Sequence, residues 1–186
     1  MKVSLYALME NVIKPVIGDF LTKALTTMDF FHHETHEGRA FNLTGTITLP
    51  AGGVYEILII TPDTTRWIHL DSLSAESDAS LTATLYVDSS RTDASGNRLT
   101  PSNRDFNSAN TTVATLCHTP GGSGDGTQKW SKTVAADHPL SDGASVQGSA
   151  RKEWILKQNS AHLIKFEGAE NDVINYELDW YEHQPD

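Results

Sequence analysis

The sequence has few of the residues on which covalent and metal-centred chemistry depends. Cys117 is the only cysteine among 186 residues, so the chain can form no internal disulfide and no thiolate metal cluster. No apolar run of about 18 residues occurs, which predicts that no helix spans a membrane. The first residues also lack the cleavage site of a signal peptide. These absences predict a protein that is made and kept inside a cell until something releases it.

Basic residues are scarce too. The chain has 14 Lys and Arg against 24 Asp and Glu, which gives a net charge of −10 and a pI of about 5.1. Affinity for DNA comes mainly from Lys and Arg contacts to phosphates, so we expect no nucleic-acid partner. The 38% hydrophobic and 20% charged residues are typical of a folded domain rather than a disordered chain.

An alternating stretch dominates what is present. Between residues 41 and 49 apolar residues and Gly45 alternate with Asn42, Thr44, Thr46 and Thr48, a period of two that is typical of a half-buried strand. Residues 50–53 (PAGG) then interrupt it, and residues 54–60 (VYEILII) are apolar on both sides. This pattern predicts a hairpin that forms the first pair of a sheet.

The rest of the chain repeats this style without helical patterns between the strands. Further strands are predicted over residues 66–73, 80–87, 111–118, 128–133, 153–157, 161–167 and 172–181. Long polar loops are predicted at 88–110 and 135–151, with a flexible hairpin turn at 121–126. The fold class is therefore predicted to be all-β, an antiparallel β-sandwich or jelly roll of about eight strands.

Two of these strands carry specific predictions about their faces. In the final strand Ile174, Tyr176, Leu178 and Trp180 form one apolar face. In residues 66–73, alternation puts Trp67, His69, Asp71 and Leu73 on one face and Ile68 and Leu70 on the other.

Residues 4–28 differ from the rest of the chain, because their apolar residues recur at steps of three and four. We predict an N-terminal helical arm that Pro15 breaks or kinks, with an arm and hinge over residues 1–36 and a β-sandwich domain over residues 37–186. The stripe either covers the edge of the sandwich or reaches a neighbouring subunit. The apolar residues of this stripe are Leu5, Leu8, Met9, Val12, Ile13, Ile17, Phe20, Leu21 and Leu25.

Candidate chemical groups are present but none completes a site. His32 and His36 would share one face of a helix and could bind a divalent metal, whereas the simpler interpretation of this segment is a solvated hinge. Adjacent side chains in a strand point to opposite faces, so Cys117 and His118 should not form a thiolate pair, and Cys117 is expected to be buried. The pairs Asp137–His138 and His69–Asp71 lack a nucleophile and a third, orienting group. We therefore predict no catalytic residue, no metal ligand, no cofactor and no enzyme activity.

The four tryptophans allow two interpretations. Trp67, Trp130, Trp154 and Trp180 all fall at strand positions, where most tryptophans belong to the core. They could instead stack on sugar rings, which would make the chain a carbohydrate-binding module.

Several stretches resemble structural proteins of tailed bacteriophages, notably the decoration (cement) proteins of the capsid. The resemblance covers roughly residues 30–186 and contains no catalytic motif. The stretches that carry it are residues 36–41 (HEGRAF), 59–62 (IITP), 85–88 (LYVD), 100–104 (TPSNR) and 110–112 (NTT).

The resemblance implies a subunit of a virion that is assembled in the host cytoplasm. It implies contacts with the major capsid protein or other virion proteins, and a homo-oligomer, namely a trimer. On this interpretation residues 3–25 bind a neighbour or the shell, and the two long loops face outward or touch adjacent subunits. A tail or tail-fibre adaptor is the alternative virion role, and a carbohydrate-binding β-sandwich module is the alternative outside it.

Overall fold

The structure is a computed structural model that describes residues 30–135, 144–147 and 153–184. The chain divides into two compact units, Met1–His33 and Glu34–Asp186. The nine apolar residues of the predicted arm, from Leu5 to Leu25, lie outside the described residues, as do Asp137 and His138. Most of the described residues therefore belong to the second unit.

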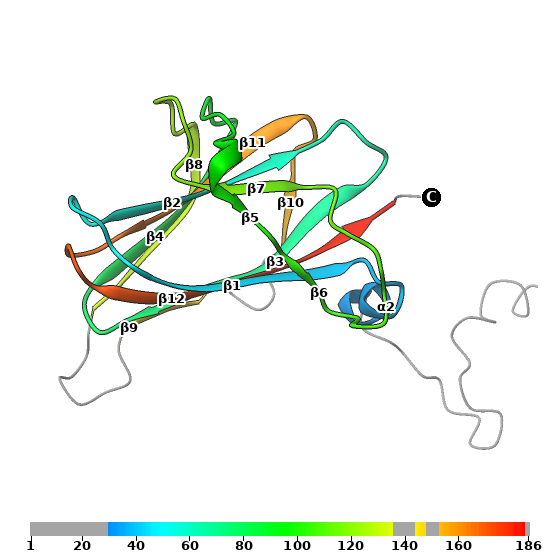
Figure 1. Ribbon diagram of the computed structural model, residues 1–186, viewed down its shortest axis with the longest axis horizontal. Coiled ribbons are helices and arrows are strands. Elements are labelled where there is room, and N and C mark those ends of the chain that lie inside the picture. The colour runs from blue at the N-terminus through cyan, green and yellow to red at the C-terminus, as the bar shows by residue number, and fades with distance from the viewer. Residues whose placement is uncertain (1–29, 136–143, 148–152, 185–186) are drawn as a thin grey trace, which may run out of the picture. The chain divides into compact units, whose positions relative to one another are not determined.

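The second unit is an all-β sandwich of two antiparallel sheets, which confirms the predicted fold class at that level (Figure 1). Sheet A has the order β10 (Trp154–Leu156), β3 (Trp67–Ser77), β12 (Val173–His183), β1 (Ala40–Thr48) and β6 (Ser102–Asn103), and β9 (Ala144–Gln147) also pairs with β3. Sheet B has the order β5 (Arg98–Leu99), β7 (Thr115–His118), β2 (Val54–Thr61), β11 (Ser160–Glu167), β4 (Leu81–Val87) and β8 (Thr127–Val134).

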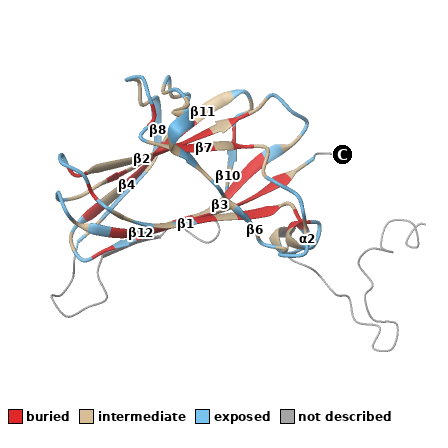
Figure 2. Cartoon of the chain, in the orientation of Figure 1, coloured by how far each residue is buried: buried red, intermediate tan, exposed pale blue. Residues whose placement is uncertain are grey.

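The inward faces of the two sheets form the main core, and buried residues follow the strands of both (Figure 2). The predicted apolar face of β12 is confirmed, because Ile174, Tyr176, Leu178 and Trp180 are all buried. Phe41 of β1 packs on Trp180 with ring centroids 5.9 Å apart. The alternation of apolar and polar residues therefore identified the inward faces of β1 and β12 correctly.

The predicted first hairpin is wrong. β1 pairs with β12 and β6 in sheet A, whereas β2 pairs with β7 and β11 in sheet B. The turn at residues 50–53 carries the chain from one sheet to the other. It needs glycine at Gly53, where φ is 65° and a Cβ would lie 2.0 Å from the carbonyl oxygen of Gly168. Two strands on opposite sides of one core show the same alternation as two paired strands, so the pattern could not distinguish them.

The predicted faces of residues 66–73 are correct as far as Leu70 but wrong beyond it, because β3 contains a β-bulge. Ser72 lies opposite Asp179 but Leu70 lies opposite Trp180, so Asp71 is an extra residue. A bulge reverses the alternation beyond it. Leu70 and Leu73 are consequently both buried in the core instead of lying on opposite faces.

The polar connections contain more structure than the sequence predicted. Residues 88–110 include the 3₁₀ helix η1 (Ser95–Asn97) as well as β5 and β6, and residues 144–147 form β9. The hinge contains a short helix, α2 (Phe30–His36). Strand β7 is shorter than predicted, because the buried carboxylate of Glu182 accepts hydrogen bonds from the Thr112 hydroxyl at 2.5 Å and the Val113 amide at 2.8 Å. Burial raises the pKa of Glu182, and these hydrogen bonds partly offset that rise.

Candidate functional site

The outer face of sheet B carries a second, smaller apolar core. Cys117, Leu58, Leu163 and Tyr86 lie in register on neighbouring strands, and the first three are fully buried. Ala94, from the connection after β4, packs against them. This cover explains why the sequence of β2 is apolar on both sides, since one side faces each core.

Arg91 holds the covering chain in place through ionic contacts. Its Nη2 lies 2.8 Å from Glu56 Oε1 and 2.7 Å from Asp125 Oδ1, and its Nη1 donates to the carbonyl of Gly122 at 2.8 Å. Lys165 Nζ lies 3.2 Å from Asp125 Oδ2. Burial tends to raise the pKa of Asp125, but the hydrogen bonds from Arg91 and Lys165 outweigh it and the pKa falls below its ordinary value. The network joins β2, β11 and two loops.

The glycine-rich turn is not the flexible hairpin turn that the sequence predicted. It connects β7 to β8, which lie apart in sheet B, and it packs on residues 89–92. Ser90 N donates to Gly124 O, and Thr92 and Gly121 exchange backbone hydrogen bonds, all at 3.0 Å. A Cβ at Gly124 would lie 2.0 Å from Ser90 Oγ and 3.2 Å from Ser90 Cβ, so a larger residue there would require the Ser90 side chain to move.

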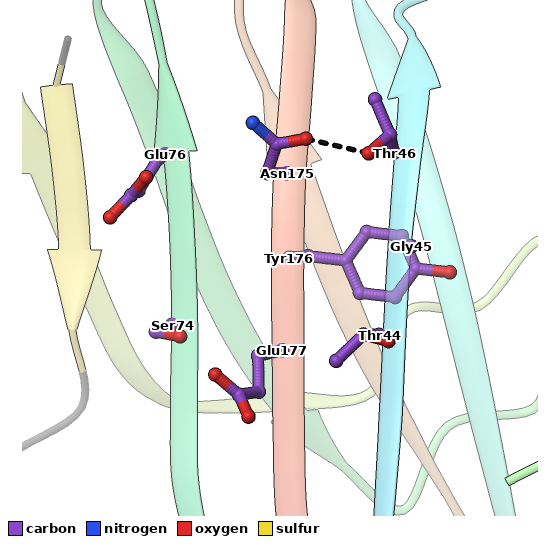
Figure 3. Close-up of a pocket in the computed structure, with 8 residues that line it drawn as sticks. All are labelled: Thr44, Gly45, Thr46, Ser74, Glu76, Asn175, Tyr176 and Glu177. Atoms are coloured by element: carbon purple, nitrogen blue, oxygen red, sulfur yellow. Dashed lines mark hydrogen bonds between the residues drawn. The ribbon is translucent and has the colours of Figure 1, made fainter. Parts of the chain in front are cut away.

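Part of the outer face of sheet A, in contrast, is polar and exposed, and we call this part the open face. Threonine, serine, asparagine and glutamate side chains follow β1, β12 and β3 around a shallow depression of about 330 Å³ (Figure 3). Thr46 Oγ1 donates to Asn175 Oδ1 at 2.6 Å, and Glu177 Oε1 accepts from Asn42 Nδ2 at 3.0 Å. The residues that line the depression are Thr44, Gly45, Thr46, Ser74, Glu76, Asn175, Tyr176 and Glu177.

One glycine in this region is required by an aromatic neighbour. Gly45 lies opposite Tyr176 in the β1–β12 register, and a Cβ at residue 45 would lie 2.5 Å from the Tyr176 hydroxyl oxygen. The Tyr176 ring packs on Phe166 at 5.9 Å and on Tyr55 at 5.8 Å between centroids. Gly45 therefore occupies an inward-facing position of β1, where the absence of a side chain leaves room for the Tyr176 ring of β12.

The bulge in β3 gathers titratable side chains at the other end of the same outer face. His69 stacks on Tyr181 with centroids 4.6 Å apart, and Glu153 Oε1 contacts both His69 Nδ1 and, at 2.7 Å, the Tyr181 hydroxyl. Burial, followed by the hydrogen bond to Glu153, raises the pKa of Tyr181 well above its ordinary range. His183 Nδ1 lies 3.7 Å from Glu34 Oε1. The partner of His69 here is Glu153 rather than Asp71, the residue that the sequence placed beside it.

The other candidate chemical residues lie apart. Cys117 is fully buried, and burial raises its pKa, as expected of a small apolar core residue. His118 stacks on Tyr55 on the other side of the sheet, at 6.0 Å. Within the part of the chain that the structure describes, no group of three His, Cys, Asp or Glu side chains is arranged to hold a metal ion.

The tryptophans divide between the core and the surface. Trp180 is buried, and Trp130 and Trp154 pack edge to face at 5.9 Å against the core. Trp67 is 39% exposed and borders a second depression together with Ile155. Sequence reasoning missed Phe106, which is 93% exposed; the available signal was a single aromatic residue within a polar loop.

Comparison of the sequence with protein-family models and with curated proteins found no match. Among the described residues no helix has the length and apolar character that crossing a membrane requires.

Proposed function

We propose that this chain is a non-enzymatic structural subunit of a tailed-phage virion, and that it decorates the head shell by binding the major capsid protein. The observation that carries the proposal is the open, polar outer face of sheet A. Small-molecule sites are usually concave and mostly apolar. The depression on sheet A is shallow and is surrounded by polar side chains, which suits the flat surface of a protein partner.

The charge on this face favours a basic partner. Glu76 and Glu177 flank the depression and are exposed, and Asp179 lies further along β12. Arg104 Nη1 lies 2.6 Å from Asp179 Oδ1 and compensates one of these three carboxylates. A partner with Lys or Arg facing Glu76 and Glu177 would therefore be selected by electrostatic complementarity, which acts mainly on specificity and association rate.

Three further features that the sequence predicts for this protein form part of the same proposal. They are a jelly-roll strand order, a homotrimeric assembly and a helical arm whose apolar stripe, from Leu5 to Leu25, binds a neighbour or the shell. Deleting residues 1–30 should leave a folded sandwich, because the residues of the main core run from Phe41 to Trp180. The truncated protein should no longer bind particles, and full occupancy by it would contradict the role of the arm.

Charge reversal tests the open face directly. Glu76→Lys combined with Glu177→Lys should abolish co-sedimentation of the purified protein with phage heads that lack it. The control is Glu170→Lys, at an exposed position in the turn before β12, which should bind as the wild type does. Undiminished binding by the double variant would refute the use of this face. Co-sedimentation with tails instead of heads would favour the tail-adaptor role.

A further inference from the structure

An aromatic side chain projects from one edge of sheet A. Phe106 is 93% exposed and lies in the loop that follows β6, in residues 103–110, which we call the knob loop. A fully exposed phenylalanine leaves a large apolar surface in water, and such side chains are typical anchors of protein interfaces.

The knob loop is held by hydrogen bonds within the loop and to the carbonyl of Gly38. Asp105 accepts from the amide of Asn107 at 2.9 Å, and its own amide donates to Asn103 Oδ1 at 2.9 Å. The side chains of Asn103 and Asn110 both donate to the carbonyl of Gly38, at 2.8 Å and 3.2 Å. Because the loop is fixed, presenting Phe106 to a partner would cost little conformational entropy.

A matching recess lies on the opposite edge of the same sheet. Trp67 at the start of β3 and Ile155 in β10 are 39% and 56% exposed and border a depression of about 230 Å³. Leu156, Lys157 and Gln158 complete its lining. We call this depression the socket.

The positions of the knob loop and the socket exclude a contact within one chain. β6 and β10 are at the two ends of the strand order of sheet A, four strand spacings apart, which is roughly 19 Å at about 4.8 Å for each spacing. We propose that Phe106 of one copy of this chain inserts between Trp67 and Ile155 of a second copy.

The charges around the two surfaces are complementary. Asp105 precedes Phe106, and Lys157 lies at the rim of the socket with 66% of its side chain exposed, while its Nζ lies 2.7 Å from Asp88 Oδ1. A copy that docks through Phe106 brings the Asp105 carboxylate toward this lysine. Opposite charges at the rim of an apolar contact favour the docked orientation over others.

The contact is head-to-tail, because each copy contributes its knob loop to one neighbour and its socket to another. Such contacts close into a ring when the rotation between copies allows it, and otherwise extend into a filament. This inference concerns self-association alone and does not depend on the proposed role in a virion, since the purified chain should show it in the absence of particles.

Complementary variants test the proposal by sedimentation of the full-length protein. Phe106→Ser keeps the socket, and Trp67→Ser keeps the knob loop, so each variant alone should be monomeric while the wild type assembles. An equimolar mixture should contain heterodimers of twice the monomer mass and nothing larger. If Trp67→Ser fails to fold, Ile155→Ser replaces it. A monomeric wild type at every concentration, or assembly by either variant alone, would overturn the proposal.

Cysteine pairs give a second readout. Chains with Asn107→Cys, beside the knob, mixed with chains with Lys157→Cys, at the rim of the socket, keep Phe106, Trp67 and Ile155 unchanged. The mixture should form a disulfide-linked dimer under oxidation, and neither variant should cross-link with itself. The buried Cys117 is present in both variants and controls for nonspecific oxidation. Cross-linking of Asn107→Cys with itself would mean a two-fold symmetric contact and refute the head-to-tail arrangement. Quenching of Trp67 fluorescence by glycans in a monomeric protein would instead make the socket a carbohydrate site.

Discussion

The two sheets turn their inner faces toward one shared core, but their outer faces differ in what covers them. On sheet B the chain buries Leu58, Cys117 and Leu163 under its own loops and fastens the cover with Arg91. On sheet A the open face around Thr44 and Glu177 carries polar side chains that are exposed.

This difference assigns different roles to the two outer faces, since one adds to folding stability and the other is available for binding. Apolar surface that the chain covers itself adds to folding stability at about 25 cal/mol for each Å² removed from water. A polar open face contributes little to stability, so its residues can vary according to what binds there. Substitutions beneath the cover of sheet B should therefore cost more stability than substitutions on the open face of sheet A.

Leu163→Ala should destabilise the protein by about 3 kcal/mol, because it opens a cavity in the second core on the outer face of sheet B. Denaturant unfolding followed by fluorescence measures the change. The matched control on sheet A is Thr46→Ala, at an exposed position, which should stay within about 0.5 kcal/mol of the wild type. Equal losses in both variants would remove the distinction between the two faces.

Arg91→Ala should cost about 2 kcal/mol, because Glu56 and Asp125 would be left half-buried without their shared cation. Arg91→Lys should recover part of the loss, since lysine keeps the charge but cannot form the forked contacts. Hydrogen exchange should report faster opening of residues 89–92 and 121–126 in both variants. The control is Arg98→Ala, which removes the exposed ion pair with Asp93; its backbone amides in these two segments should exchange as fast as those of the wild type.

Asp125→Asn should weaken the dependence of the free energy of unfolding on pH in the acid range. The pKa of Asp125 is lower in the folded protein than its ordinary value of 3.8, so its carboxylate stabilises the fold above that pH. This contribution is lost as the pH falls below 3.8 toward the folded-state pKa. We expect an effect of up to about 1 kcal/mol, since the site is partly exposed.

Thermal unfolding between pH 2 and pH 7 measures the effect of Asp125→Asn. Glu170→Gln removes one exposed carboxylate outside the network and controls for net charge. An acid limb as steep in Asp125→Asn as in the wild type would show that the network under the loops does not link stability to pH.

Glu76→Lys combined with Glu177→Lys should leave the free energy of unfolding unchanged within about 0.5 kcal/mol, because both side chains lie on the open face. Denaturant unfolding measures it, and the same double variant should lose binding to particles. A large loss of stability would mean that these carboxylates support the sheet itself.

Local sequence patterns predicted most strands but not their partners. The alternation of β12 identified Ile174 to Trp180 as an inward face, and β8 and β11 fall where the sequence placed them. The same reasoning paired β1 with β2, whose residues face one core from opposite sheets. It also missed the bulge at Asp71, because a single extra residue is visible only against the partner strand.

The candidate sites were less predictable than the strands. A lone phenylalanine in a polar loop gave no sign that Asn103, Asn110 and Gly38 would hold it outward. Nor could the sequence indicate that Trp67 and Ile155, far apart in the chain, border one depression.

Composition and local periodicity were enough to establish that this protein is all-β, which sides of its clearest strands face inward, and that its one thiol is buried. These properties follow from the two-residue period of a strand, which neighbouring residues define among themselves. Which outer face is covered and which is open emerged only from the packing of the whole chain. That outcome depends on Arg91 reaching Glu56 and Asp125, and contacts between residues so distant in sequence exist only once sheet B and its loops have come together.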